Sequence, residues 1–359
     1  MTAQCSQKVL NALSMIESKF GASTLPTIEE YMVGALDTGS MCLNAAIGIG
    51  GFPRGSIAEI YGEPDSGKTT ALLVAVAKTQ SNGELCAWID AEKSFDPVYA
   101  QSLGVILEQL IMINPKTGED GLEIVRLLAE TDGISLIVVD SVAALVPKMD
   151  LDVAIGDTMA GLQARMMSSA TKQLIDVIHS NKIVVAFTNQ TRTKLPQFDG
   201  DKATTQSVGG QALKHYARVR IEMKAFEPIL NGKQQVGSIC VAKVIRNKVG
   251  NKGKVAPYYF DETRYNQFDD MLDLGLLCGA ITKQLQKVDD PKEDEPDSVE
   301  CFVLGGNSLG TSRKQARDCL QNFQQARDFL LSEFKRLNVV FKPAETNSKQ
   351  AQALPAPTN

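Results

Sequence analysis

The sequence predicts an α/β fold with a mainly parallel sheet and a phosphate-binding loop. Short apolar runs alternate with amphipathic stretches between residues 56 and 189, which is the order of strands and helices in a doubly wound sheet. The run Ile137-Val138-Val139 shows no polar alternation, as is typical of parallel strands that are buried on both faces. The segment Gly62–Thr69 matches G-x-x-x-x-G-K-T directly after one of these runs.

The elements follow in order along the chain. Val9, Leu13 and Ile16 repeat at the helical period and predict an amphipathic helix over 6–20, which Gly21 ends. Strands are predicted at 56–61, 85–90, 110–113, 135–140 and 183–189. Helices are predicted between them at 68–79, 97–103, 121–130 and 159–179.

The pattern changes after Gly210. Strand-like segments at 217–224 and 237–245 flank a turn at Asn231-Gly232 and predict an antiparallel extension of the sheet. Residues from 268 onward predict a small, mainly helical C-terminal α/β domain, whose last helix spans 312–337. We therefore expect an N-terminal helix and linker (1–32), a core (33–267), a small domain with an acidic insert at 287–300 (268–341), and a disordered tail (342–359).

The composition argues against several classes of protein. The chain has 359 residues, of which 43% are apolar and 22% charged, as in soluble globular proteins. Its apolar runs are shorter than the ~18–20 residues of a membrane helix, and the N-terminus lacks the features of a secretory signal. We therefore expect a cytoplasmic protein that does not enter membranes. Seven scattered cysteines without a CxxC pair argue against a disulfide framework or a zinc site.

The charge is unevenly distributed. The formal net charge is −5, yet residues 182–254 contain fourteen Lys or Arg and four Asp or Glu, a local net charge of +10. Concentrated positive charge is typical of a nucleic-acid groove. Lysines that guard a solvated sheet edge would give the same count. Charge alone leaves both interpretations open.

The glycine-rich loop predicts a nucleotide site. Its glycines allow backbone N–H groups to face phosphate oxygens, and the N-terminus of the following helix adds partial positive charge. Lys68 would meet the β- and γ-phosphates of ATP, and the Thr69 hydroxyl would ligate Mg²⁺. The expected nucleotide-binding residues of this segment are Gly62, Glu63, Pro64, Asp65, Ser66, Gly67, Lys68, Thr69 and Thr70.

Polar residues at the ends of three other predicted strands complete the expected site. Asp140 would support Mg²⁺ through water, although a strand-end Asp can also cap a helix. Glu92 would polarise the water that attacks the γ-phosphate, its alternative being an ordinary surface acid. Gln190 would hydrogen-bond the γ-phosphate and report its presence to the loop that follows.

Several blocks of the sequence, between about residue 6 and residue 335, resemble the bacterial RecA recombinase family. They are Gly62–Thr70, Asp90-Ala91-Glu92, Asp96–Ala100, Val138–Leu145, Gly161–Met167, Asn189-Gln190 and Gly209–Lys214. The resemblance implies a RecA-type core and a DNA-dependent ATPase. It implies a helical filament on single-stranded DNA that catalyses homologous pairing and strand exchange with double-stranded DNA, in recombination, DNA repair and the SOS response.

The resemblance also implies roles for individual residues. Glu92 falls at the position of the general base. Asp96 and Tyr99 fall where the family contacts adenine, Tyr99 by stacking. Arg246 and Lys248 fall where the family reaches the ATP of the neighbouring protomer. The expected catalytic residues are therefore Glu92, Lys68, Gln190, Arg246 and Lys248.

A DNA-binding surface and a subunit contact are implied in the same way. Residues 147–161 and 191–210 match the two DNA loops of the family, and the helix at 6–20 matches the element that docks onto the next subunit. The residues at DNA-contact positions are Arg165, Ser168, Lys172, Arg192, Lys194, Leu195, Gly209, Gly210, Gln211 and Lys243.

Some positions depart from the family pattern. His215 replaces a Phe at the subunit contact, Val241 stands where Arg is frequent, and Asp261–Arg264 replaces the usual Tyr-Gly-Glu-Gly. These departures indicate a divergent member, of the kind expected from a phage or mobile element. A hexameric helicase with the same core and a nucleotide-gated binding protein with little turnover are the alternative functions.

Overall fold

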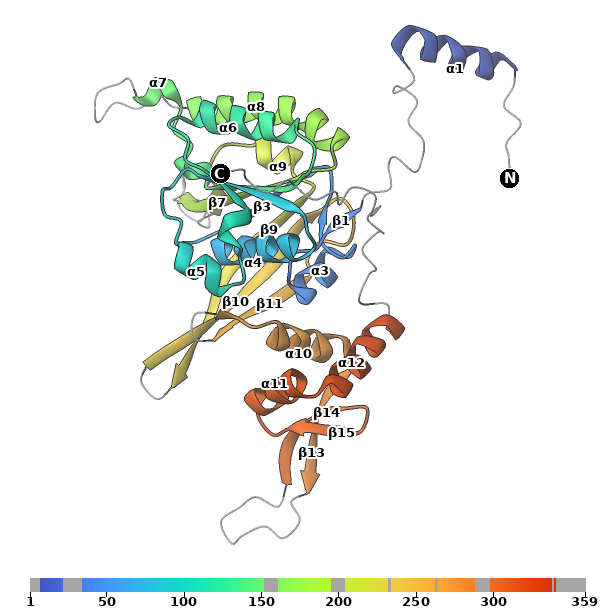
Figure 1. Ribbon diagram of the computed structural model, residues 1–359, viewed down its shortest axis with the longest axis vertical. Helices are drawn as coiled ribbons and strands as arrows, with labels where there is room; N and C mark the ends of the chain where they lie inside the picture. Colours follow the sequence, from blue (N-terminus) through green and yellow to red (C-terminus); the bar gives the residue numbers. More distant parts are fainter. Residues whose placement is uncertain are drawn as a thin grey trace, which may run out of the picture. The chain divides into compact units, whose positions relative to one another are not determined.

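The computed structural model describes residues 7–21, 34–151, 161–194, 204–231, 234–261, 264–287, 298–337 and 339. The contacts within the chain divide it into one unit up to Gly34 and another from Ala35 onward. The first unit contains α1 (Gln7–Phe20), which confirms the predicted N-terminal helix (Figure 1). The predicted linker beyond Gly21 and the predicted tail at 342–359 lie outside the described residues.

A large mixed sheet forms the centre of the second unit. Its strands are β3 (Ser56–Gly62), β4 (Leu85–Asp90), β5 (Leu110–Ile113), β6 (Ile134–Asp140), β7 (Val184–Lys194), β8 (Thr204–Ser207), β9 (Val219–Asn231), β10 (Gln234–Asn247), β11 (Val255–Asp261) and β12 (Arg264–Tyr265). The order is β12-β11-β10-β9-β3-β7-β6-β4-β5, with β8 beside β7. Pairing is parallel from β9 to β5 and antiparallel from β9 to β12, which confirms the predicted extension.

Helices cover both faces of this sheet (Figure 1). They are α4 (Lys68–Ser81), α5 (Pro97–Ser102), α6 (Gly118–Ala129), α8 (Leu162–Ser180) and α9 (Ala212–Tyr216). Leu72 of α4 belongs to the core on one face, and Leu174 of α8 belongs to the core on the other. Within β6, Val138 points into the first core, whereas Ile137 and Val139 point into the second. This double burial explains why the strand sequences lack polar alternation.

The C-terminal segment has both helices and strands, in line with the expected α/β domain. Its elements are α10 (Gln267–Cys278), β13 (Ile281–Lys287), β14 (Ser298–Leu304), β15 (Asn307–Gly310), α11 (Arg313–Asn322) and α12 (Gln324–Arg336). The three strands pair antiparallel. Smaller elements of the core are β1 (Ala35–Leu36), which pairs with β2 (Phe52–Pro53), α3 (Met41–Ile47) and α7 (Lys148–Leu151).

Several sequence-based boundaries were wrong. The strand expected at 217–224 is β9, which extends to Asn231 because β10 pairs with it. The helix expected at 312–337 is two helices, because Phe323 between them adopts extended backbone angles. Arg327 Nη1 donates to the carbonyls of Leu320 and Gln321, whose helical partners are lost at this break. β7 extends to Lys194, five residues beyond its expected end, because β8 pairs with it. The expected acidic loop at 287–300 includes the ends of β13 and β14, and its remainder lies outside the described residues.

Asp270 of α10 joins the C-terminal segment to the core. Its carboxylate accepts hydrogen bonds from the Ser40 hydroxyl at 2.9 Å and from the Met41 backbone N–H at 2.5 Å, at the N-terminus of α3. Burial raises the pKa of Asp270 to about 6, although the hydrogen bonds from Ser40, Met41 and Cys42 act in the opposite direction. The carboxyl group is therefore easier to protonate in the folded chain than in the unfolded chain.

We expect Asp270 to make the free energy of unfolding depend on pH. A folded-state pKa above the ordinary 3.8 means that its contribution is complete below pH 4 and is lost as pH rises to about 6. The contribution amounts to roughly 3 kcal/mol at most. Urea unfolding between pH 4 and pH 7 measures it, and Asp270→Asn should remove this part of the slope. Asp132→Asn, at an exposed acid, is the control, and an unchanged slope in Asp270→Asn would refute the assignment.

Candidate nucleotide and nucleic-acid site

The phosphate loop lies between β3 and α4, as the sequence predicts. Gly62 has no room for a side chain, because a Cβ there would lie 2.2 Å from the Met223 carbonyl oxygen. Gly67 has a φ of 85° and precedes α4 without forming a side-chain cap. A left-handed backbone without a capping side chain leaves the first N–H groups of α4 available to an anion. The loop therefore fits the phosphates of a nucleotide.

Lys68, Thr69 and Asp140 lie around this helix start. The Lys68 ammonium group donates to the Glu63 carbonyl at 2.5 Å, so it folds back over the loop. Burial lowers its pKa, while the carboxylates of Asp140, Glu92 and Asp65 act in the opposite direction. The Thr69 hydroxyl donates to Asp140 Oδ2 at 3.1 Å. A hydroxyl beside a carboxylate is the oxygen donor set that suits Mg²⁺ next to phosphate oxygens.

The Asp140 carboxylate accepts hydrogen bonds from two threonine hydroxyl groups, and neither bond caps a helix. The Thr188 hydroxyl of neighbouring β7 donates to Asp140 Oδ1 at 2.5 Å, while Thr69 binds the other oxygen. Burial raises the pKa of Asp140, and these two hydrogen bonds partly oppose the effect. Thr188 was missed by sequence analysis, since it continues an apolar strand and its partner lies on another strand.

Glu92 and Gln190 meet at the same edge of the sheet. Gln190 Nε2 donates to Glu92 Oε1 at 3.2 Å, and the Ser141 hydroxyl donates to the same oxygen. Gln190 pairs with Gly62 in the strand register, which places it beside the start of the phosphate loop. Glu92 is exposed, but its carboxylate is oriented by two side chains. Ser141, which follows Asp140 directly, is a second site residue that sequence analysis missed.

The expected adenine residues lie beside the loop. The Tyr99 hydroxyl and the Thr70 hydroxyl are 2.9 Å apart, so α5 is held against α4. Asp96 Oδ1 accepts from the backbone N–H groups of Val98 and Tyr99 and thereby caps α5. Asp96 thus has a structural role that explains its position whether or not it contacts a base. These hydrogen bonds lie within the protein, so the adenine contacts of Asp96 and Tyr99 stay predictions.

Several expected DNA-binding residues converge between α8 and α9. Arg165 and Ser168 line a hollow of about 450 Å³ together with Gln211 and His215. Gly210 has a φ of 80°, and a Cβ there would lie 2.7 Å from the Ala164 Cβ, so only glycine allows this approach. Gly209 has the same left-handed backbone beside Val142.

The other expected DNA-binding residues lie elsewhere or are not described. Lys172 is exposed on α8, and Lys243 is exposed on β10. The backbones of Arg192 and Lys194 belong to β7, opposite Gln206 and Thr204 of β8. Their side chains and the whole of Leu195 lie outside the described residues.

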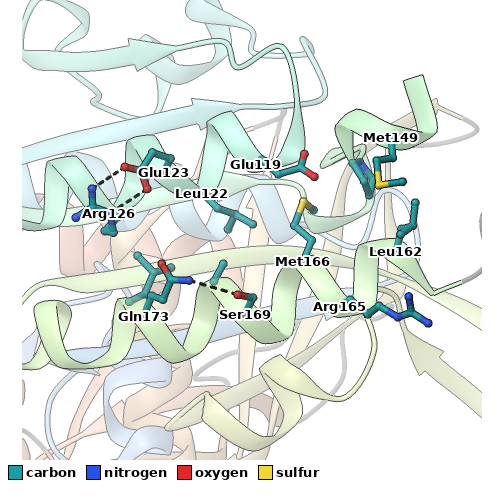
Figure 2. A pocket seen from close by; sticks show the side chains of 13 residues that line it. Glu119, Leu122, Glu123, Arg126, Met149, Leu162, Arg165, Met166, Ser169 and Gln173 are labelled. Carbon is teal, nitrogen blue, oxygen red and sulfur yellow. Dashed lines mark hydrogen bonds and ion pairs between the residues drawn. The ribbon is translucent and has the colours of Figure 1, made fainter. Parts of the chain in front are cut away.

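A second hollow, of about 430 Å³, is lined by residues of both α6 and α8 (Figure 2). Arg165 lies beside Leu162 and Met149 at one end of this groove, and the ion pair between Glu123 and Arg126 lies at the other. Arg165 lines both hollows and therefore marks the place where they approach each other.

Arg246 and Lys248 lie at the end of β10, away from the phosphate loop. The Lys248 ammonium group approaches the His215 carbonyl oxygen at 3.4 Å. Burial lowers the pKa of Lys248, and the positive charges of Arg246 and Arg218 lower it further. Among the described residues, no hydrogen bond or ion pair joins Arg246 or Lys248 to Lys68 or Glu92.

Comparison with known proteins identifies the family. A family model described as the RecA N-terminal domain matches residues 7–260, which is more than half of the chain. The chain belongs to the RecA family. It is 38% identical to Protein RecA of Symbiobacterium thermophilum over 96% of this chain and 97% of the relative. It is 38% identical to Protein RecA of Chloroflexus aurantiacus over 88% and 87%, and 44% identical to that of Thermotoga petrophila over 69% and 70%.

RecA family membership settles the broad function expected from the sequence. The chain is an ATP-dependent recombinase with DNA-dependent ATPase and strand-exchange activity, and the hexameric helicase is not favoured. The large mixed sheet is consistent with the RecA-type core. Within the described part of the chain, no helix combines the length and apolar character needed to cross a membrane.

Proposed function

We propose that this RecA-family chain assembles with ATP and Mg²⁺ into a helical filament on single-stranded DNA and pairs that strand with homologous duplex DNA. The observation that carries the proposal is a direct link between the two candidate sites. The Val208 N–H donates to the Gln190 carbonyl at 3.1 Å, and Asn189 Nδ2 donates to the Val208 carbonyl at 2.9 Å. Gln190 contacts the expected general base, and Val208 lies three residues before Gln211, which lines the hollow between α8 and α9.

This link gives the ATP site a route to the DNA site. A γ-phosphate that accepts a hydrogen bond from the Gln190 side-chain amide would compete with Glu92, which accepts from the same amide. Movement of Gln190 would displace Val208, because both ends of the intervening segment are bonded at this point. Gly209, Gly210 and Gln211 follow directly. Nucleotide state would therefore bias the position of the DNA-facing backbone.

In the proposed mechanism, residues of this chain orient the reactants. Lys68 and the N-terminus of α4 bind the phosphates. Thr69 and Asp140 would hold Mg²⁺, which neutralises charge on the phosphate oxygens when bound. Glu92 accepts a proton from the attacking water as general base, while Ser141 holds the carboxylate in place. Tyr99 would stack on adenine.

The strand register supports an in-trans role for Arg246 and Lys248. β9 runs parallel to β3, with Val219 opposite Ala58 and Met223 opposite Gly62. The phosphate loop follows Gly62 at one edge of the sheet, whereas Lys248 continues the ladder beyond Val219 at the other edge. The end of the strands that carries the phosphate loop and the end that carries Lys248 are four to five residues apart. At ~3.3 Å per residue this distance is roughly 15 Å. We infer that Arg246 and Lys248 serve the ATP of the next protomer and not their own.

Assembly also needs a docking element, and α1 suits that role. Val9, Leu13 and Phe20 are exposed on this helix and recur at helical spacing on one face, with Leu10 at the border of that face. An apolar face that its own unit leaves in water is stabilised when it packs against another surface. We propose that α1 docks onto the neighbouring protomer.

Electron microscopy of negatively stained protein tests the proposed assembly. With single-stranded DNA and ATP we expect continuous helical filaments. Closed rings would instead support a hexameric motor. The absence of both filaments and ATP turnover would support a nucleotide-gated binding protein.

Arg165→Ala tests the DNA surface. If Arg165 neutralises a DNA phosphate, the slope of log affinity against log salt for single-stranded DNA should decrease by ~0.7, and affinity should fall. Titration of a fluorescent oligonucleotide at several salt concentrations measures both. Lys314→Ala removes an exposed positive charge from α11 and should change neither. Unchanged slope and affinity in Arg165→Ala would place the DNA site elsewhere.

A further inference from the structure

We propose that Arg218 is a third cation of the interface site and binds phosphate oxygens of the neighbouring protomer's ATP beside Arg246 and Lys248. This inference rests on the in-trans role proposed above for those two residues. Arg218 directly precedes β9 and has no part in the roles that the family resemblance supplies.

The strand register places the cations on one face. Arg246 of β10 lies opposite Arg220 of β9. The ladder continues past both strands, because the Lys248 N–H donates to the Arg218 carbonyl at 2.9 Å. Opposite residues, and residues two positions apart on one strand, point to the same side of an antiparallel pair. Arg218, Arg220, Arg246 and Lys248 therefore share one face at the end of this pair.

These four cations differ in whether a carboxylate compensates their charge. Arg220 Nε bonds to Oε2 of the buried Glu59 at 2.5 Å. In the part of the chain that the structure describes, Arg218, Arg246 and Lys248 form no ion pair with a carboxylate. The Arg218 Nη1 atom is moreover buried and has no hydrogen-bond partner. Three positive charges thus remain uncompensated on a single face.

This arrangement is unfavourable in an isolated protomer. Like charges directly opposite each other destabilise a strand pair, and Arg218 lies opposite Lys248. The lowered pKa of Lys248 reflects burial together with the repulsion from Arg246 and Arg218. A buried N–H of a guanidinium group without an acceptor adds to the cost. A bound anion with several oxygens would offset the repulsion among these three cations.

A phosphate group of a second copy's nucleotide fits these requirements. The planar guanidinium group of Arg218 is always charged and its donors suit phosphate oxygens. The chain's own phosphate loop cannot provide the anion, because Arg218 pairs at Ile57, at the opposite end of β3 from Gly62. The anion must come from another molecule. In the proposed filament the adjacent Lys248 would bind the ATP of the next protomer.

The test compares Arg218→Gln, Arg218→Lys and Lys252→Gln as full-length proteins with single-stranded DNA. Lys252→Gln is the matched control, since it removes an exposed positive charge from the connection that follows β10. We expect Arg218→Gln to raise the ATP concentration for half-maximal filament assembly roughly 10- to 100-fold, the usual range for losing one charged hydrogen bond. Arg218→Lys should recover part of this loss. The binding of a fluorescent ATP analogue to dilute protomers should not change in any variant.

The possible outcomes distinguish the proposed role of Arg218 from the in-trans role of Arg246 and Lys248 on which it rests. If Lys248→Ala impairs ATP-dependent assembly and Arg218→Gln behaves as wild type, Arg218 is not part of the site. If Lys248→Ala also behaves as wild type, the in-trans proposal itself fails. An Arg218→Gln defect that appears as a lower salt slope of DNA binding, with the ATP requirement unchanged, would assign Arg218 to DNA and overturn the inference. If Arg218→Gln does not fold, Arg218→Lys must show an ATP requirement above wild type for the inference to survive.

Discussion

Lys248→Ala is expected to lower DNA-stimulated ATP hydrolysis by a factor on the order of 10³, the lower end of the range for a missing in-trans arginine finger. The reason is that Lys248 would stabilise charge on the phosphoryl group as it leaves the neighbouring protomer's ATP. Its own phosphate loop is unchanged, so nucleotide binding to dilute protomers should persist. Steady-state turnover with single-stranded DNA measures the effect, and Lys252→Ala is the matched control.

Mixing two inactive variants gives the decisive version of this experiment. Lys68→Ala lacks a functional phosphate loop but retains the cations at the end of β10. In a mixed filament there are two kinds of interface between unlike protomers, and one of them pairs an intact loop with an intact Lys248. Some ATPase activity should therefore return. Co-assembly must be shown separately by labelling the two variants, and if they co-assemble without any recovery, Lys248 does not act in trans.

Glu92→Gln should reduce hydrolysis by ~10²-fold or more, the scale of losing a positioned general base. The substituted amide keeps an oxygen that can accept from Ser141 and Gln190, so the local arrangement should be retained. ATP binding should be unchanged because the phosphate loop is intact. Filaments on DNA should consequently last longer after dilution, which light scattering can follow.

The matched control for this prediction is Glu108→Gln, which makes the same chemical change at an exposed acid just before β5. It should hydrolyse ATP at the wild-type rate. Wild-type hydrolysis by Glu92→Gln in the presence of DNA would show that another group activates the water. Reduced ATP binding by Glu92→Gln would mean that the substitution disturbed the loop and not only the base.

The sheet could be predicted because each buried parallel strand is a continuous apolar run. That signal found β3, β4, β5, β6 and β7 in order. The apolar pattern does not predict β8, because Thr204–Ser207 is short and polar and is recognised as a strand through its pairing with β7. It also failed at Phe323, because a helical pattern continues on both sides and only the backbone angles show the break.

The candidate site was predictable where a residue stands at the end of a strand. Asp140, Glu92 and Gln190 were found in this way, because the carboxyl ends of parallel strands meet at one edge. Thr188 could not be found, since its hydrogen bond to Asp140 depends on β6 and β7 being neighbours. Arg218 lacks a carboxylate partner because of the strand register and because Glu59 pairs with Arg220. The sequence shows neither the register nor this pairing.

The bonds between Gln190, Asn189 and Val208 also have a consequence for the segment that they close. They hold together residues 190 and 208, the two ends of segment 191–207, and Thr191 pairs with Ser207 just inside that closure. Doubling the length of a loop with fixed ends costs only about 0.6 kcal/mol of closure entropy. The fold therefore tolerates changes in the length of this segment: residues inserted or removed between 191 and 207 should leave Gln190 and Glu92 in place on the other side of the closure.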